Sequence, residues 1–183
     1  NGEGQLGVMA AMMLMTVLYT CRVARPEITR AITFLAKRIT KWDFRCDQRL
    51  HRLMCYVNCA TDDQMMGWIG DDPTELSAHL FCDADFAGCP YTLKSTNGCH
   101  ADIQGPNSRI PWSSGSNGQT STAQSTPEAE LNSLNSGLKS RGEPCLDLLG
   151  TILGQFHDKG WKLTVNVHED NTTAIAGVRS GKN

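Results

Sequence analysis

Three acidic residues that are far apart in the sequence fall where strands and helices are expected to begin or end. Asp83 closes a short apolar run, Glu130 lies in the first turn of an expected helix, and Asp170 follows a run of alternating polarity. Side chains at such ends converge over one edge of a sheet. Carboxylates drawn together repel one another unless cations hold them, and Mg²⁺ prefers such hard oxygen ligands. The spacing predicts a divalent-metal site, while acids that cap helices or solubilise loops remain the alternative.

A pair of metal ions at such a site would give a specific chemistry. Two ions about 4 Å apart can activate a water molecule and stabilise the leaving oxygen of a phosphodiester. Serine-nucleophile chemistry has no such support, because Ser113 and Ser114 have no partner that the sequence makes evident. His79, His100 and His168 are scattered along the chain, and we expect each to be an ordinary surface or core histidine.

Length and composition limit the class of protein. The chain has 183 residues, of which 40% are hydrophobic and 20% charged, so it suits one domain, or one domain with an appendage. These values exclude a wholly disordered, collagen-like or multi-span membrane protein. The net charge of -2 gives no overall field that would mark a nucleic-acid binder. None of the eight cysteines forms a CxxC pair, and we interpret most of them as reduced and buried.

Residues 7–21 form an uncharged segment, which Arg22 and Arg25 follow. A membrane-spanning helix needs about 20 residues, so this segment is short for that role. We expect a buried core helix. A helix embedded in a membrane or covered by a partner is the alternative.

Residues 26–60 are expected to be helical, with Pro26 in the first turn. Basic residues recur in this segment at intervals of three or four, so a continuous helix would present them on one face. They are Arg38, Lys41, Arg45, Arg49 and Arg52. Such a face is either an ordinary solvated surface or a stripe of cations that follows a nucleic-acid backbone.

The rest of the chain predicts an α/β fold. Short strands are expected at 78–82, 98–103 and 109–113, with a turn at 113–118. Helices at 127–141 and 145–156, a strand at 162–167 and a helix at 171–179 follow, with Thr126 as the first N-cap. Three meandering strands followed by α/β alternation favour a mixed sheet with helices packed on it.

Several motifs resemble those of one family in the order that the family has them. His79-Leu80-Phe81-Cys82-Asp83-Ala84-Asp85-Phe86-Ala87-Gly88 is similar to the "SDADWAG" stretch of the ribonuclease H domain in copia-type LTR retrotransposon Pol polyproteins. Residues 94–98, 110–114, 125–131 and 168–176 resemble its "KSTSG", "ISWSS", "SSTEAEY" and "CDNQAAIA". Residues 14–28 resemble the segment that joins reverse transcriptase to ribonuclease H. No single motif is decisive, but five in the right order are a strong signal.

The resemblance implies a ribonuclease H-like mixed sheet of three antiparallel strands plus a parallel one, with flanking helices and a helical N-terminal segment. It also implies metal-dependent cleavage of the RNA strand of RNA–DNA hybrids. By position, Asp83, Glu130 and Asp170 match the catalytic and metal-binding acids, and Asp85 and Glu128 are their neighbours in the same motifs. The expected cofactor is a pair of Mg²⁺ ions, with Mn²⁺ as a substitute. The 2′-hydroxyl would distinguish RNA from DNA.

The family also suggests context. Residues 1–68 are expected to form a helical connection segment, and 69–183 a ribonuclease H-like domain that is incomplete at its C-terminus. The partners would be an RNA–DNA hybrid and the reverse transcriptase portion of the same polyprotein, in a cytoplasmic virus-like particle or the nucleus.

Two other functions stay open. The chain could be a non-catalytic, retrotransposon-derived structural subunit, docked through residues 7–57 onto other protein subunits in a larger, membrane-associated assembly that 7–21 contacts. It could also be a non-catalytic nucleic-acid binder that uses the basic residues between Arg38 and Arg52. We rank the binder last, because no aromatic residue interleaves the basic positions to stack bases.

Overall fold

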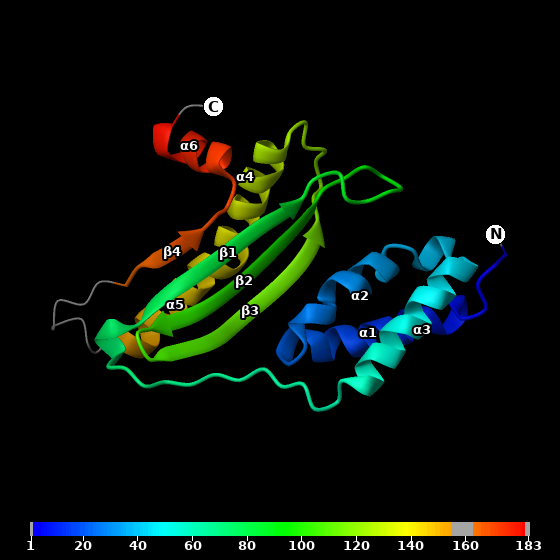
Figure 1. Ribbon diagram of the computed structural model, residues 1–183, viewed down its shortest axis with the longest axis horizontal. Coiled ribbons are helices and arrows are strands. Elements are labelled where there is room, and N and C mark those ends of the chain that lie inside the picture. The colour runs from blue at the N-terminus through cyan, green and yellow to red at the C-terminus, as the bar shows by residue number, and fades with distance from the viewer. Residues whose placement is uncertain (1, 155–162, 182–183) are drawn as a thin grey trace. The chain divides into compact units, whose positions relative to one another are not determined.

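The computed structural model describes residues 2–154 and 163–181. The chain divides into two compact units, Asn1–Met65 and Met66–Asn183. The division is close to the expected boundary between residues 68 and 69. Figure 1 shows a helical N-terminal unit, in blue and cyan, and a second unit that contains a sheet. Each unit is described below by itself.

Three helices make up the N-terminal unit: α1 (Gly7–Val23), α2 (Thr29–Ala36) and α3 (Phe44–Cys59). Helices α2 and α3 are amphipathic and turn an apolar stripe inward, whereas α1 is apolar nearly all round and buries one face. The side chains that meet there include Leu14 of α1, Ile32 and Leu35 of α2, and Leu50 and Leu53 of α3. These residues form the core of the unit.

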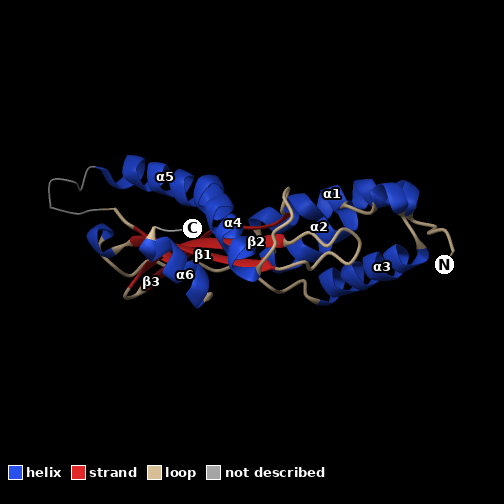
Figure 2. Cartoon of the chain, turned by 90° about the horizontal axis from the view of Figure 1, so that it is seen from above, coloured by secondary structure: helices blue, strands red, loops and turns tan. Residues whose placement is uncertain are grey.

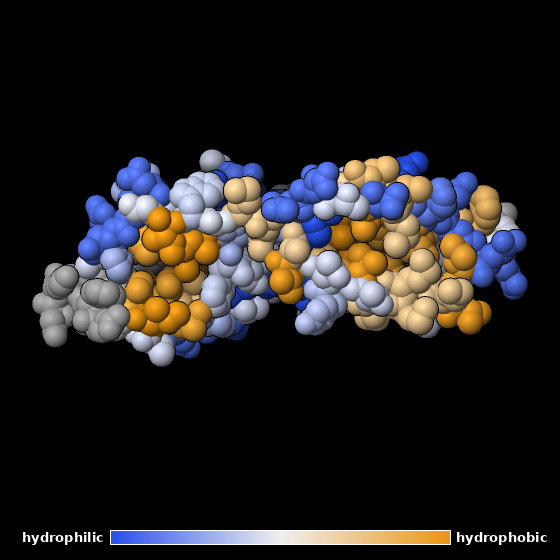
Figure 3. All heavy atoms as spheres, turned by 90° about the horizontal axis from the view of Figure 1, so that it is seen from below, coloured by the Kyte–Doolittle hydropathy of each residue, from blue (hydrophilic) through white to orange (hydrophobic). Residues whose placement is uncertain are grey.

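Helix α1 is buried along only one face. Ala10, Leu14 and Cys21 are buried, whereas Val8 is 96% exposed and Tyr19 is 78% exposed. The expectation of a buried core helix is therefore wrong for the outer face, which stays apolar although it is in contact with solvent. Among the described residues, no helix combines the length and apolar character needed to cross a bilayer. Figure 3 shows apolar surface, in orange and tan, over the N-terminal unit at the right.

The helix expected over residues 26–60 is interrupted. Short 3₁₀ turns occupy Pro26–Ile28 and Ile39–Lys41, and Trp42 and Asp43 have extended backbone. Asp43 then caps α3 by accepting a 2.9 Å hydrogen bond from the Cys46 N–H. The Trp42 indole donates to Asp47 Oδ1 at 2.7 Å, which holds the extended turn in place.

This break separates the basic residues. Arg38 and Lys41 lie before α3, so the prediction of one helical face with five cations is wrong. Arg45, Arg49 and Arg52 still share a face of α3, because they are spaced four and three residues apart.

The second unit contains the expected mixed sheet. Its strands are β1 (Ser77–Asp85), β2 (Thr96–Gly105), β3 (Ser108–Gly118) and β4 (Val165–His168), in the order β3-β2-β1-β4. The first three pair antiparallel, and β4 pairs parallel with β1. The predicted α/β class, with three antiparallel strands and one parallel strand flanked by helices, is confirmed.

Strand β3 is longer than the sequence predicts. Residues 113–118, expected as a turn, continue the strand, with Ser116 opposite Gly98 and Gly118 opposite Thr96. Glycine and serine have low strand propensity, so this stretch gives no strand signal of its own. Pairing with β2 supplies its backbone hydrogen bonds.

Helices α4 (Thr126–Gly137) and α5 (Glu143–Leu153), joined by a π-helical turn at Leu138–Gly142, cover one face of the sheet. Figure 2 shows both on the same side of the strands. Cys145 and Leu149 of α5 pack against Ala78 and Ile103 of the sheet. Helix α6 (Thr172–Ser180) follows β4.

One helix start differs from expectation, and two boundaries fall outside the described residues. Ser125, rather than Thr126, caps α4, because its hydroxyl accepts from the Glu128 N–H at 3.3 Å. The last residues predicted for the helix at 145–156 and the first predicted for the strand at 162–167 lie outside the described part of the chain.

All eight cysteines are free thiols; four of them are buried: Cys21, Cys46, Cys82 and Cys145.

Candidate metal centre

Strand β1 places Asp83 near its carboxyl end. Burial alternates along the strand, so that Cys82 and Ala84 are buried while Asp83 and Asp85 are exposed. Successive side chains of a strand point to opposite faces of the sheet, so the buried residues face the core and the exposed ones face solvent. Asp83 therefore lies on the solvent-facing side of β1, two residues before the strand ends.

Helix α4 brings Glu130 to the same place. Its neighbour Ala129 packs with Ala84 in a small apolar cluster. The buried Ser133 hydroxyl donates to the Asp83 carbonyl at 2.7 Å and also lies 3.3 Å from the Gly98 carbonyl. These contacts fix the helix over the end of β1 and leave Glu130 only 4% exposed.

Strand β4 supplies Asp170. Phe81 of β1 is in register with His168 of β4, and the two strands run parallel. Two residues further along the chain from each are Asp83, still within β1, and Asp170, just past the end of β4, so one acid lies at the carboxyl end of each of two neighbouring strands. Asn171 then accepts from the Ala174 N–H at 3.0 Å and begins α6 directly after Asp170.

The structure brings the three carboxylates together. One oxygen from each of Asp83, Glu130 and Asp170 lies within 4.8 Å of the others. Three separate elements deliver these oxygens. Such a set of hard oxygen donors fits a divalent cation of the Mg²⁺ or Mn²⁺ type, with water completing the coordination.

Glu130 has an unusual electrostatic environment. Burial, and then the negative charges of Glu169, Asp83 and Asp170, raise its pKa to about 7, and a hydrogen bond from the Ala84 backbone only partly opposes this. Its Oε2 atom is buried and has no hydrogen-bond partner among the described residues. A buried acceptor without a donor is costly, and a cation would relieve that cost.

Glu169 is a fourth acid that sequence reasoning missed. Its Oε1 accepts from the Asn171 N–H at 3.0 Å, whereas Oε2 is buried without a partner in the described chain. It also lines a hollow together with Asp83 and Asp170. Its position beside Asp170 could have marked it as a site residue. In a strand, however, neighbouring residues point to opposite faces, which would place Glu169 away from Asp170. This alternation does not apply to Glu169 and Asp170, because β4 has ended at His168.

The two neighbouring acids of the motifs lie outside this cluster. Glu128 accepts a 2.8 Å hydrogen bond from the Gln124 N–H and so stabilises the start of α4. The Asp85 carboxylate lies against Gly88, where an added Cβ would collide with it. The structure therefore separates these acids from Asp83 and Glu130.

Two of the three histidines that are far apart in the sequence, His79 and His168, meet in the folded chain. His79 Nδ1 and His168 Nε2 are 2.8 Å apart across the β1–β4 pair, and the Phe81 ring stacks on His168 at 4.2 Å. Desolvation and the charge of His168 lower the pKa of His79. His100 has a different partner, the Ser114 hydroxyl, 2.6 Å from its Nδ1. Cross-strand register, which the sequence did not reveal, creates these pairs.

The predicted basic residues lie in the N-terminal unit and have different surroundings. Arg38 is 3.5 Å from the Asp43 carboxylate, in an ion pair. The Arg49 guanidinium lies 4.6 Å from the centre of the Phe34 ring. Lys41, Arg45 and Arg52 are exposed. An aromatic residue does accompany these cations, although it comes from α2 rather than from the same helix.

Comparison with protein-family models, with curated proteins and with solved structures gives no match to this chain.

Proposed function

We propose that this chain is a metal-dependent nuclease that cleaves the RNA strand of RNA–DNA hybrids. The observation that carries the proposal is the meeting of Asp83, Glu130 and Asp170, with Glu130 buried and one of its oxygens unpartnered in the described structure. The mixed sheet and the order of the sequence motifs support the same assignment. The assignment of hybrid cleavage to this chain rests on the resemblance of its motifs to those of the copia-type ribonuclease H domain.

The protein's own groups would act as follows. Asp83 and Asp170, which are exposed, would receive the cations from solvent, and Glu130 would close the site from the helix side. Bound Mg²⁺ would supply Lewis acidity at the scissile phosphate and lower the pKa of a water molecule. Glu130 must lose its proton before it ligates, so metal binding and deprotonation are coupled.

The proposed substrate follows from the cleaved bond and from the family. Discrimination for RNA would depend on the 2′-hydroxyl, which DNA lacks. In the polyprotein context that the motifs suggest, the reverse transcriptase portion of the same polypeptide would deliver the hybrid.

The test is cleavage of an end-labelled RNA–DNA hybrid by the full chain in Mg²⁺. We expect cutting of the RNA strand that stops with a chelator and falls at least 100-fold in Asp83→Asn, since that change removes a charged ligand. Glu128→Gln is the matched control, because Glu128 lies outside the cluster and should keep the wild-type rate. An unchanged rate in Asp83→Asn would refute the proposal.

A second function has one observation in its favour. Val8, Met12, Met15, Tyr19 and Val23 follow one exposed face of α1 at intervals of three or four residues. A contiguous exposed apolar face is typical of a protein–protein contact. We infer as the alternative that the chain is a structural subunit that docks through this face.

Analytical ultracentrifugation, which measures self-association, distinguishes this alternative from the nuclease proposal. A subunit should self-associate or bind its assembly through α1, and Met12→Glu should abolish that association while Asp83→Asn leaves it intact. A chain that is monomeric at all concentrations tested, and cleaves hybrids, would exclude the alternative.

A further inference from the structure

We propose that the N-terminal unit binds a single-chain anionic amphiphile, such as a medium-chain fatty acid, in a groove between α2 and α3. The groove has a volume of about 700 Å³, within the range of 300–1,000 Å³ that is typical of small-molecule sites. It is lined only by residues between Glu27 and Tyr56, so it belongs entirely to this unit. The proposal is independent of the nuclease site.

The floor of the groove suits a hydrocarbon chain. Ile28, Leu35 and Leu53 are buried core residues, and each also contributes to the lining. Ala31 lies between them on α2 and is exposed, which leaves the groove open above its small side chain. Burial of apolar ligand surface against such a floor is favourable, because it removes that surface from water.

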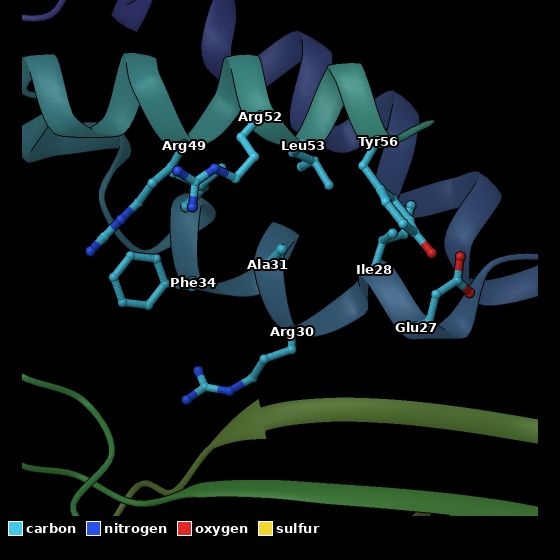
Figure 4. A pocket seen from close by; sticks show the side chains of 10 residues that line it. Glu27, Ile28, Arg30, Ala31, Phe34, Arg49, Arg52, Leu53 and Tyr56 are labelled. Atoms are coloured by element: carbon cyan, nitrogen blue, oxygen red, sulfur yellow. The ribbon is translucent and has the colours of Figure 1, made fainter. Parts of the chain in front are cut away.

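Positive charge gathers at one end of the groove. Figure 4 shows the Arg30, Arg49 and Arg52 side chains near Phe34, and Glu27 and Tyr56 at the opposite end. The Glu27 carboxylate accepts a 2.6 Å hydrogen bond from Arg25 Nε, so that end is occupied by an ion pair. Guanidinium groups bind carboxylates well because their N–H donors match the two oxygens.

This asymmetry favours a ligand with charge at one end only. A fatty acid would place its carboxylate between the arginines and its tail along Ala31 and Leu53 toward Tyr56. A nucleic acid fits less well, because its phosphates repeat along the chain and the far end of the groove carries Glu27. The face of Phe34 that a base would need is also covered by Arg49, at 4.6 Å.

The experiment is calorimetric titration of the full chain with dodecanoate below its micellar concentration. We expect one binding site, with at least tenfold weaker binding for dodecanol, which lacks the charge, and for acetate, which lacks the tail. A charged hydrogen bond contributes about 1.5–3 kcal/mol, so Arg49→Gln together with Arg52→Gln should weaken dodecanoate at least tenfold. Arg45→Gln on the same helix is the control and should bind normally, since Arg45 does not line the groove.

A second variant tests the location without disturbing the core. Ala31→Phe places a bulky ring in the groove from an exposed position, and should abolish dodecanoate binding while the circular dichroism spectrum stays unchanged. Equal affinity for dodecanol and dodecanoate, or full binding in the double arginine variant or in Ala31→Phe, would overturn the proposal. So would an oligonucleotide that displaces dodecanoate.

Discussion

The Ser133 hydroxyl donates a 2.7 Å hydrogen bond to the carbonyl oxygen of Asp83 and so joins α4 to β1 directly beside the acidic cluster. Ser133 is fully buried and lies three residues after Glu130, nearly one helical turn. This uncharged contact joins the two elements that carry two of the three carboxylates. Its removal tests whether the helix is positioned by packing alone.

Ser133→Ala should lower the free energy of unfolding by about 1–2 kcal/mol, because a buried hydrogen bond is lost. It should also weaken Mn²⁺ binding several-fold, although no charge changes. Urea denaturation and metal titration measure the two effects. Asn135→Ala, at an exposed position of the same helix, is the control. Weaker folding with unchanged Mn²⁺ affinity would show that the contact does not position Glu130.

The raised pKa of Glu130 predicts a pH dependence of stability. Its pKa is about 7 in the folded chain against an ordinary value of 4.5, so the folded state keeps a proton that the unfolded state has lost. Without metal, this group's contribution to stability is full below pH 4.5 and is lost as the pH rises to about 7. The difference corresponds to about 3 kcal/mol, at about 1.4 kcal/mol for each pKa unit.

Glu130→Gln removes this effect. Relative to the wild type, the variant should become more stable between pH 5 and pH 8 in the presence of a chelator. Glu128→Gln controls for the loss of one negative charge on α4. Urea curves at several pH values measure the difference. Parallel pH profiles of wild type and Glu130→Gln would show that Glu130 keeps an ordinary pKa.

Glu169 should act on the site through Glu130. Its charge is the second cause of the raised pKa of Glu130, after burial. In the wild type, Mn²⁺ affinity should therefore rise with pH through about 7, as Glu130 loses its proton. In Glu169→Gln the midpoint of this rise should move to lower pH. A titration followed by electron paramagnetic resonance measures the midpoint, and one that does not move would exclude the coupling.

The packing of α4 on the sheet gives a prediction about stability alone. A Cβ added at Gly137 would lie 2.6 Å from Cys82 Sγ, whereas at Gly150 in α5 it would meet nothing within 4 Å. Gly137→Ala should destabilise the fold by about 1–3 kcal/mol through overpacking. Gly150→Ala should stabilise it by about 0.5–1 kcal/mol, because alanine favours helix. Thermal denaturation compares the pair, and equal shifts would contradict the packing.

The sequence was most informative where a local pattern coincides with a local structure. The short apolar run at residues 78–82 and the Ser125-Thr126-Pro127 start of α4 located the elements that carry Asp83 and Glu130. Asp170 followed from the same reasoning, because parallel strands align their carboxyl ends. The elements that carry Asp83 and Glu130 were therefore recognised from residues that are neighbours in the chain.

Other features depend on contacts between distant segments, and the sequence did not reveal them. The strand at residues 113–118 exists because β2 pairs with it, and the His79–His168 contact depends on the register of β1 and β4. Asp47, just after the break before α3, accepts hydrogen bonds from the Gln5 and Leu6 N–H groups, which are more than 40 residues away in the chain. Glu169 was missed because the end of β4 could not be placed to the residue.

The most direct test of the metal site is the number and affinity of Mn²⁺ ions that the full chain binds, measured by electron paramagnetic resonance at pH 8. We expect binding that Mg²⁺ displaces, that Glu128→Gln preserves, and that Asp83→Asn, Glu130→Gln and Asp170→Asn each weaken at least tenfold. Mn²⁺ affinity that is the same in the wild type and in all three variants would contradict a metal centre at these carboxylates.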